Sequence, residues 1–302
     1  MDSGLMKRHL TGRLVPLNKV HPEIPHPHQM RPRIALSPML KLLESRFKDK
    51  LDDYMNNQMV VSQTGFVKGC GTHVNICRLV RKCKESQNKN ERAVVLFIDF
   101  KSAYNNVPLK KLFNILQQKE ILDEDEIEFI RALYSNTTLK VGDNNVYINK
   151  GVMQGSTISP ALFNIFLEPL LLELSEITGV DDIFAYADDV VVFCNSISQL
   201  NKVIEIIRNW SRANEIPINF DKSGILNILS RKNSLPMIRD AKISDVPVVG
   251  SYKYLGIWLN ETLDPAFHLE KKEGKVDFLT RKLKIIPKHS TTPRLLIIYG
   301  HC

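Results

Sequence analysis

Residues 184–193 read Phe-Ala-Tyr-Ala-Asp-Asp-Val-Val-Val-Phe, so two adjacent carboxylates stand between two short apolar runs. Apolar, β-branched segments on either side of a short polar pair are typical of a tight β-hairpin, and we expect its turn to carry Asp188 and Asp189. Carboxylates held this close raise each other's pKa, and no basic residue within the segment offsets their charge. The segment by itself predicts either a solvated turn or a cation-binding site.

A third acid follows an apolar run further upstream. Residues 93–98 read Ala-Val-Val-Leu-Phe-Ile, which is typical of a strand buried on both faces, and Asp99 comes directly after them. Because Asp is rarely buried without a partner, we expect this strand to lie beside the hairpin, where three carboxylates converge. Carboxylate oxygens suit Mg²⁺, and two such ions roughly 3.5–4 Å apart clamp both oxygens of a phosphoryl displacement. The three acids therefore predict nucleotidyl transfer.

Further blocks lie on both sides of these acids, and their order is informative. They read Arg-Leu-Val-Pro-Leu-Asn-Lys at 13–19, Arg-Pro-Arg-Ile-Ala-Leu at 31–36, Gln-Thr-Gly-Phe at 63–66, Gly-Val-Met-Gln-Gly-Ser-Thr-Ile-Ser-Pro at 151–160, Asn-Phe-Asp-Lys-Ser at 219–223 and Tyr-Lys-Tyr-Leu-Gly at 252–256. Together with Asp99, Tyr104 and the Tyr-Ala-Asp-Asp block at 186–189, this series resembles a reverse transcriptase domain of the non-LTR retrotransposon and group II intron type. The resemblance covers residues 13–258 and extends more faintly to 299.

The resemblance implies roles for the three acids and for two residues that follow Asp99. Asp99 and Asp188 are implied to be the principal ligands of two Mg²⁺ ions, with Mn²⁺ as an alternative, and Asp189 is a third acid and metal ligand that supports the site. Tyr104 matches a steric gate, whose ring crowds the space that a ribose 2′-hydroxyl needs and thereby selects deoxynucleotides. Phe100 is placed among the substrate-binding residues. Without the nearby Asp99, Tyr104 would be read as a core aromatic at a strand end.

Gln154 and Gly155 precede residues 160–174, whose apolar content predicts a buried helix. Free N–H groups and the positive end of the helix dipole gather at a helix N-terminus, so we expect a nucleotide or template phosphate there. The resemblance implies that Gln154 and Gly155 position the incoming nucleotide and the template. It also implies that Lys222 donates a proton to the leaving pyrophosphate.

Three basic residues near the N-terminus are candidates for holding the triphosphate of the incoming nucleotide. They are Lys19, Arg31 and Arg33, and Lys and Arg both bind phosphate, as point charges or as bidentate forks. Members of the family that the chain resembles usually read Arg-Pro-Ile, whereas this chain reads Arg-Pro-Arg-Ile. The sequence therefore leaves open whether Arg31 or Arg33 contacts phosphate.

The predicted fold is α+β, with the fingers and palm of a right-hand polymerase and an antiparallel palm sheet packed on helices. We expect fingers at 1–92, a palm at 93–262 with a fingers insertion around 109–150, and only the start of a helical thumb at 263–302. The predicted elements include helices at 40–54, 74–85 and 200–214, a hairpin at 138–148 and a strand at 254–259. So short a thumb suggests a fragment of a longer polyprotein, a degenerate copy, or an enzyme whose thumb comes from a further domain or subunit.

Composition agrees with a nucleic-acid partner. The chain has 41 Lys and Arg against 33 Asp and Glu, a formal net charge of +8, which favours binding to phosphate backbones. The implied partners are an RNA template, a DNA primer and deoxynucleoside triphosphates. Five cysteines without a Cys-x-x-Cys pair indicate reduced thiols. We expect an intracellular protein, in nucleus or cytoplasm with an organelle left open, and no membrane segment, since the apolar stretch 161–174 is too short.

Three functions fit the sequence. The first is RNA-directed DNA polymerase, in which the acids bind metal and a deoxynucleotide is added to a primer 3′-hydroxyl. An RNA-directed RNA polymerase shares the palm and the paired acids, but Tyr104 at the gate position favours deoxynucleotides. The third is a catalytically incompetent retroelement remnant that acts as an RNA-binding module.

Overall fold

A computed structural model describes residues 11–18, 24, 30–141, 143–229 and 242–272 of the chain. Its largest sheet, here called the central sheet, has six strands in the order β6 (Ile183–Tyr186), β7 (Asp189–Cys194), β3 (Ala93–Ile98), β8 (Gly224–Ile228), β10 (Val246–Val249) and β9 (Lys242–Ile243). All neighbours are antiparallel except β8 and β10, which are parallel. The predicted antiparallel sheet is thus confirmed, with one parallel pair that the sequence did not indicate.

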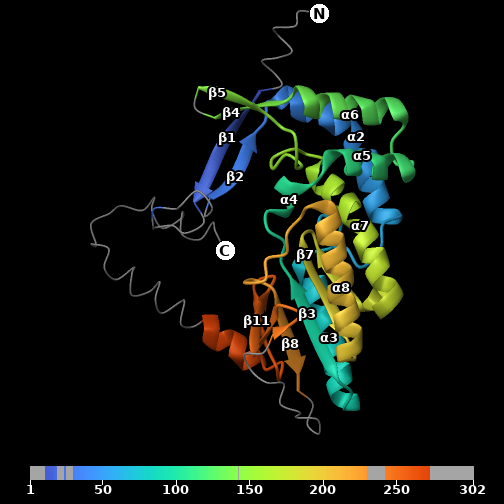
Figure 1. The fold of residues 1–302 in the computed structure, drawn as a ribbon, viewed down its shortest axis with the longest axis vertical. Coiled ribbons are helices and arrows are strands. Elements are labelled where there is room, and N and C mark those ends of the chain that lie inside the picture. The colour runs from blue at the N-terminus through green and yellow to red at the C-terminus, as the bar shows by residue number, and fades with distance from the viewer. Residues whose placement is uncertain (1–10, 19–23, 25–29, 142, 230–241, 273–302) are drawn as a thin grey trace, which may run out of the picture.

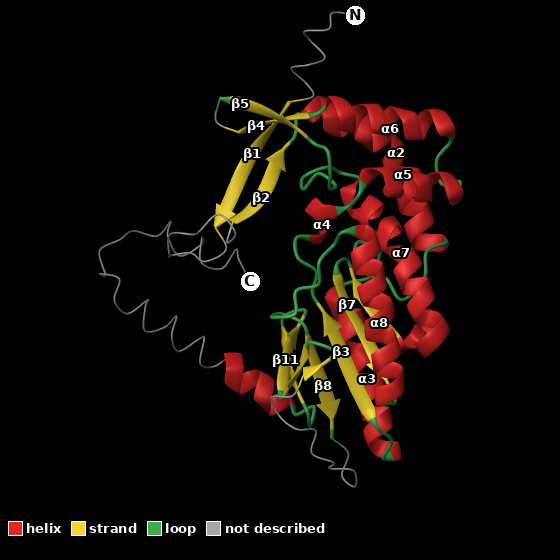
Figure 2. Ribbon diagram, in the orientation of Figure 1, coloured by secondary structure: helices red, strands yellow, loops and turns green. Residues whose placement is uncertain are grey.

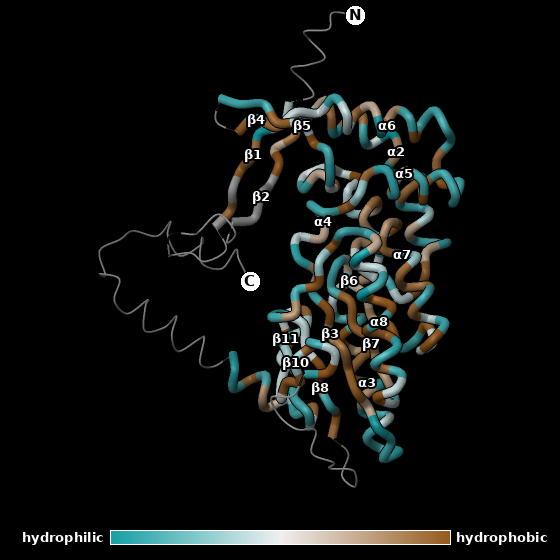
Figure 3. The backbone as a smooth tube through the Cα atoms, in the orientation of Figure 1, coloured by the Kyte–Doolittle hydropathy of each residue, from teal (hydrophilic) through white to brown (hydrophobic). Residues whose placement is uncertain are grey.

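Strand β3 is buried on both faces, as its unbroken apolar run predicts. Val94 and Leu96 pack on the side of α7 (Ser159–Thr178) and α8 (Ile197–Asn214). Val95 and Phe97 pack on the other side, against α3 (Thr72–Lys89) and the hairpin of β11 (Ser251–Tyr254) and β12 (Ile257–Asn260). Figures 1 and 2 show the central sheet between these layers. Figure 3 shows the hydrophobic segments gathered around β3 and the helices packed on it.

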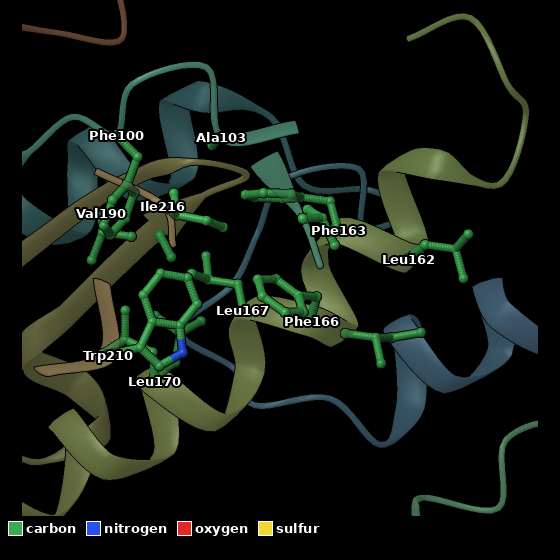
Figure 4. Packing of buried hydrophobic residues seen from close by; sticks show 14 of the residues in the cluster. Phe100, Ala103, Leu162, Phe163, Phe166, Leu167, Leu170, Val190, Trp210 and Ile216 are labelled. Atoms are coloured by element: carbon green, nitrogen blue, oxygen red, sulfur yellow. The ribbon is translucent and has the colours of Figure 1, made fainter. Parts of the chain in front are cut away.

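Aromatic rings fill the space between the central sheet and its helices. Phe100, just after β3, lies 5.5 Å from the Trp210 ring of α8, and Trp210 lies 5.6 Å from Phe166 of α7, measured between centroids. Figure 4 shows these side chains together with Phe163 and Val190. Tilted ring pairs at these distances are favourable beyond the area they bury. This packing fixes the chain at the exit from β3, where Asp99 lies.

A second sheet, here called the distal sheet, lies at the upper end of the molecule in Figure 1. Its strand order is β2 (Met30–Ala35), β1 (Thr11–Asn18), β4 (Thr138–Val141) and β5 (Asn144–Tyr147). The helical layer next to it consists of α2 (Pro38–Asn57), α5 (Leu109–Gln118) and α6 (Glu124–Asn136), with the short α4 (Ala103–Asn106) and the 3-10 helix η2 (Val180–Asp182) elsewhere. Strand β4 pairs with β1 in parallel, so residues far apart in sequence form one sheet.

Most predicted elements are confirmed, and one is wrong. The helices predicted at 40–54, 74–85 and 200–214 are α2, α3 and α8, and the hairpin predicted at 138–148 is β4 and β5. The single strand predicted at 254–259 is instead the end of β11, a turn at Leu255 and Gly256, and β12. The sequence predicts one continuous strand here because apolar residues of both β11 and β12 pack into the same cluster on one face of the central sheet.

The C-terminal region is described only in part. Residues 265–272 are helical, and the rest of the predicted thumb lies outside the described residues. No helix in the described ranges combines the length and the apolar character needed to cross a bilayer.

Candidate active site

Two neighbouring strands of the central sheet bring the predicted acids together. Ile98 of β3 pairs with Val190 of β7, so Asp99, directly after Ile98, and Asp189, directly before Val190, lie at adjacent strand ends. Tyr186 pairs with Asp189 to close the β6–β7 hairpin, which leaves Asp188 in the turn. The register confirms the predicted hairpin and brings its acids close to Asp99. The prediction that the turn carries both acids is wrong for Asp189, which begins β7 and pairs with Tyr186.

The charges of Asp188 and Asp99 act on the Asp189 carboxyl. Partial burial, followed by the charges of Asp188 and Asp99, raises the pKa of the Asp189 carboxyl to about 6. Asp189 nevertheless keeps an exposed edge, through which solvent or a ligand reaches it. A cation bound beside these acids would be held more weakly when Asp189 is protonated.

The acids do not form a ready-made metal cage. Within the described ranges, no group of three His, Cys, Asp or Glu side chains is arranged to hold a metal ion by itself. Mg²⁺ typically takes only one or two protein carboxylates and completes its shell with water and substrate phosphates. Carboxylates at the adjacent ends of β3 and β7 and in the neighbouring turn fit this kind of partial coordination.

Asp99 is oriented by the loop that carries Lys222. Asn219 donates from Nδ2 to Asp99 Oδ2 at 2.7 Å, and its backbone N–H donates to the Asp99 carbonyl at 2.8 Å. Ser223 Oγ accepts from the Asp99 N–H at 3.1 Å. Lys222 itself is exposed in this loop, and its carbonyl accepts from the Tyr252 hydroxyl at 2.7 Å. One carboxylate oxygen of Asp99 is therefore fixed by the protein.

An open cavity of about 490 Å³ adjoins the hairpin turn. Its lining includes Asp188, Asp189, Tyr104, Gln154 and Gly155, and it continues over Phe66, Met153, Ser156, Ser159, Pro160, Tyr186, Ala187 and Leu255. Five predicted site residues thus surround one cavity, while Asp99, Phe100 and Lys222 are not among its lining residues.

Tyr104 forms one wall of the cavity. Its ring stacks on Phe163 of α7 with centroids 4.3 Å apart and an interplanar angle of 11°. Its hydroxyl oxygen is buried and has no hydrogen-bond partner within the described residues. Burial, then the charges of Asp188 and Tyr186, raises the pKa of the Tyr104 phenol, so the ring stays neutral. Tyr104 is therefore both a packed aromatic and a rigid surface facing the cavity.

Gln154 and Gly155 connect the cavity to the distal sheet. The Gln154 carbonyl accepts from the Ile34 N–H of β2 at 2.8 Å, and Gln154 Nε2 donates to Asn105 Oδ1 at 3.1 Å. Gly155 has φ +127°, and a Cβ there would lie 2.2 Å from the Ile34 carbonyl oxygen. Only glycine allows this close approach of two backbones.

The N-terminus of α7 differs from the expectation of a bound phosphate. Buried Glu44 of α2 accepts from the Thr157 N–H at 2.9 Å, and Ser156 Oγ accepts from the N–H groups of Ile158 and Ser159 at 3.2 Å. Burial is the main cause that raises the pKa of Glu44. Protein side chains therefore bond the N–H groups of Thr157, Ile158 and Ser159 at the start of α7.

The remaining predicted residues are not among those that line the cavity, or lie outside the described residues. The Phe100 side chain is buried against Trp210, so only the backbone of Phe100 is available to a substrate. The backbone register of β2 places Arg31 opposite Leu17 and Arg33 opposite Val15, in the distal sheet. Lys19 lies outside the described residues.

Four polar residues near the site received no role from the sequence. Gln63 and Asn219 lie within blocks that carry the family resemblance, and Asn105 follows Tyr104 directly. Glu44 lies in a helix that otherwise reads as an ordinary surface element. For Glu44 no sequence signal existed, because its partner Thr157 is more than 100 residues away.

The central sheet, with acids at the adjacent ends of its inner strands β3 and β7, and the distal sheet together define a right-hand polymerase fold. Solved structures agree: apo telomerase from Candida tropicalis superimposes with a TM-score of 0.60 at 14% identity, over 85% of this chain and 48% of that one. Telomerase from Candida albicans, solved with a fragment of telomeric RNA, gives a TM-score of 0.56 at 12% identity, over 86% and 45%. These similarities establish the fold alone.

Sequence comparison identifies the family. The family model for reverse transcriptase, described as an RNA-dependent DNA polymerase, matches residues 18–259, and the chain belongs to this family. A Pol polyprotein from the type-1 retrotransposable element R2 of Popillia japonica is 24% identical over 220 residues, 68% of this chain and 30% of the relative. The RNA-directed DNA polymerase of the mobile element jockey from Drosophila funebris is 24% identical over 274 residues, 84% and 29%. The non-LTR resemblance is confirmed, and the chain spans about 30% of these relatives.

Proposed function

We propose that this chain is the polymerizing region of an RNA-directed DNA polymerase, which adds deoxynucleotides to the 3′-hydroxyl of a primer paired with RNA. The observation that carries the proposal is the meeting of Asp99 with the Asp188–Asp189 turn at adjacent ends of β3 and β7. The raised pKa of the Asp189 carboxyl, to which the charges of Asp188 and Asp99 contribute, supports a site built for a cation.

Asp99, Asp188 and Asp189 would hold two Mg²⁺ ions, or Mn²⁺ in their place. When bound, the two ions supply positive charge to the attacking and leaving oxygens of an in-line displacement. The protein prepares one ligand in advance, because Asn219 and Ser223 hold the Asp99 carboxylate and backbone in place. The turn between β6 and β7 presents Asp188 to the cavity, where the substrate triphosphate completes the coordination.

Tyr104 and Gln154 select and position the incoming nucleotide. The Tyr104 ring is held against Phe163, so an added 2′-hydroxyl meets a surface that cannot easily move away. Gln154 lines the same cavity, and its amide is held by Asn105. Gly155 lets the β2 backbone of the distal sheet approach the segment that lines the cavity.

Four basic residues act on the phosphates. Lys222 protonates the leaving pyrophosphate, and its place in the loop that orients Asp99 supports this role. Lys19, Arg31 and Arg33 contact the triphosphate from the fingers, and the position of Arg31 and Arg33 in the distal sheet is compatible with either arginine as the phosphate ligand.

The proposed domain division follows the two sheets in part, since α3 lies within the assigned fingers range but packs on the central sheet. Residues 1–92 form the fingers and 93–262 the palm, and the pairing of β4 with β1 supports a fingers insertion around 109–150. We assign residues 263–302 to the thumb, of which the described part, 265–272, is helical. RNA template, DNA primer and deoxynucleoside triphosphates are the substrates, and the described cysteines, which are free thiols, support an intracellular location in nucleus or cytoplasm.

Primer extension on a homopolymer RNA template tests the proposal. Wild type, Asp99→Asn and Asp188→Ala are compared with Asp181→Asn, an exposed acid of η2 whose side chain is 86% accessible. We expect synthesis by wild type and Asp181→Asn and none by the two site variants, with circular dichroism showing that all four are folded. Equal residual synthesis in all four proteins would contradict catalysis by this site.

The same assay separates the other two functions. Ribonucleotides offered in place of deoxynucleotides test the RNA-polymerase alternative, which requires that they be incorporated. We expect the Tyr104 ring to prevent this incorporation. A remnant that only binds RNA would shift an RNA band in Mg²⁺-free buffer and extend no primer under any condition.

A further inference from the structure

The turn that carries Asp188 is held by a side chain from a distant segment. Gln63 is 3% exposed, and its Oε1 accepts from the N–H of Ala187 at 2.9 Å. Its Nε2 donates to the Ala187 carbonyl at 3.2 Å. One amide side chain therefore bonds both backbone groups of the residue before Asp188, in the manner of a neighbouring β-strand.

Ala187 needs such support because its backbone is unfavourable. Its φ is +53°, a left-handed conformation that costs an L-residue roughly 1–2 kcal/mol. Conformations of this kind persist only where the surrounding structure fixes them. The bonds from Gln63 stabilise this conformation, and the direction in which the chain leaves Ala187 determines where Asp188 lies.

Gln63 is itself held rigidly. Its Oε1 also accepts from the Gly65 N–H at 2.9 Å, and a Cβ on Gly65 would lie 2.3 Å from the Ala187 nitrogen. The segment on either side bonds to β6, with Ala185 N–H donating to the Ser62 carbonyl and Thr64 N–H to the Ala185 carbonyl, each at 2.9 Å. The Gln63 amide thus has one available placement.

We propose that Gln63 is a positioning residue of the active site, which sets the place of the Asp188 carboxylate by fixing the backbone of Ala187. The proposal rests on the proposed polymerase function, since it assigns Gln63 to the presentation of a metal ligand. Residues that orient a metal ligand typically change metal affinity or activity about 10–100-fold when they are replaced. Gln63 touches neither substrate nor metal in this role.

Two substitutions of buried amides separate positioning from stability. Gln63→Met keeps the length of the side chain and removes every bond to Ala187. The control is Asn75→Leu, because Asn75 is also fully buried and donates from Nδ2 to the carbonyl of Ala185, within β6 and before the turn, at 2.9 Å. Both variants lose a buried amide, and both should unfold at lower temperature than wild type.

Mn²⁺ binding is measured on the full chain by the electron paramagnetic resonance of free Mn²⁺, without nucleic acid. We expect Gln63→Met to weaken Mn²⁺ binding about tenfold or more, and Asn75→Leu to bind as wild type does. In single-nucleotide incorporation, Gln63→Met should need more Mg²⁺ for half-maximal rate, while its KM for the nucleotide at saturating Mg²⁺ stays near that of wild type.

Equal Mn²⁺ affinity in Gln63→Met and Asn75→Leu would overturn the role of Gln63. If Gln63→Met is insoluble, Gln63→Asn replaces it. Asn keeps the polar amide, but its side chain is one methylene shorter and does not reach Ala187. If the wild-type protein binds Mn²⁺ but extends no primer, the polymerase function is contradicted. The role of Gln63 is then still decided by the Mn²⁺ affinities of the two variants. Wild type that binds no Mn²⁺ would overturn both.

Discussion

Asp189 gives the site a pH dependence whose sign follows from its neighbours. Partial burial and the charges of Asp188 and Asp99 raise the pKa of Asp189 to about 6 in the folded protein. Metal binds the ionised carboxylate, so we expect Mn²⁺ affinity to fall as the pH falls through about 6. An Asp189→Asn variant should bind more weakly at neutral pH and lack this step.

Without metal, the contribution of Asp189 to folding stability depends on pH in the opposite direction from metal affinity. Because the folded state holds the Asp189 proton more tightly than the unfolded chain, folding is favoured at low pH, and this contribution is lost as the pH rises from about 4 to about 6. In EDTA, the melting temperature of wild type relative to Asp189→Asn should fall across that range. If the difference in melting temperature between wild type and Asp189→Asn stays constant with pH, the three carboxylates do not interact.

At the level of single residues, the sequence predicts ligands better than the residues that orient them. The sequence indicates Asp99, Asp188 and Asp189 as ligands because a charged residue beside a buried apolar run is costly unless it is paired or bound to a cation. Gln63 and Glu44 act through bonds to backbone groups more than 100 positions away, and such pairings depend on the tertiary fold. Glu44 looks like an ordinary surface residue in the sequence, and the block that contains Gln63 gives no indication of its partner Ala187.

Among the elements, helices α2, α5 and α7 are joined by a buried polar cluster. Glu168 of α7 is 2% exposed and accepts from the Tyr54 hydroxyl at 2.7 Å, from Lys119 Nζ at 2.6 Å and from the Val60 N–H at 3.0 Å. Lys119 also donates to the Tyr54 hydroxyl at 2.9 Å. Because every oxygen of the Glu168 carboxylate is bonded, the cluster fixes the position of α7, which carries Phe163 behind Tyr104.

Removing Lys119 should therefore be costly. Lys119→Met leaves the Glu168 charge buried without its cation, a change that costs about 3–5 kcal/mol for a fully buried pair. We expect the lower end of this range in urea unfolding, since the Lys119 side chain is 22% exposed. Lys48→Met, which removes an exposed pair with Asp52 on α2, is the control and should cost less than about 1 kcal/mol. Equal losses would show that the cluster contributes nothing specific.

The predictability of an element depends on how it is buried. Strand β3 was predicted because both of its faces are covered, which demands an unbroken apolar run. The β11–β12 hairpin was read as one strand because its two short arms cover the same layer of side chains, and only the turn at Leu255 separates them. Pairing of β4 with β1 in parallel was not predictable from local pattern, since it joins segments more than 100 residues apart.

On the scale of the whole molecule, positive charge is unevenly placed. The four strands of the distal sheet carry Arg13, Arg31, Arg33 and Lys140 and contain no Asp or Glu. Arg13 and Lys140 are neighbours in the register of β1 and β4, and both are exposed. Like charges side by side in a sheet are destabilising unless an anion offsets them. The sheet therefore favours contact with a phosphate backbone, and its exposed Tyr147 offers a ring for base stacking.

Salt dependence of RNA binding measures this contribution. Each phosphate contact with a single strand adds about 0.7 to the slope of log affinity against log salt. Arg13→Gln combined with Lys140→Gln should lower the slope for single-stranded RNA by about 1.4 when both residues contact phosphate. Lys84→Gln with Lys89→Gln is the matched control, because it removes the same charge from exposed positions on α3, at the other end of the molecule in Figure 1. If the two double variants lower the slope equally, RNA is held by net charge alone, and the distal sheet has no special part in binding.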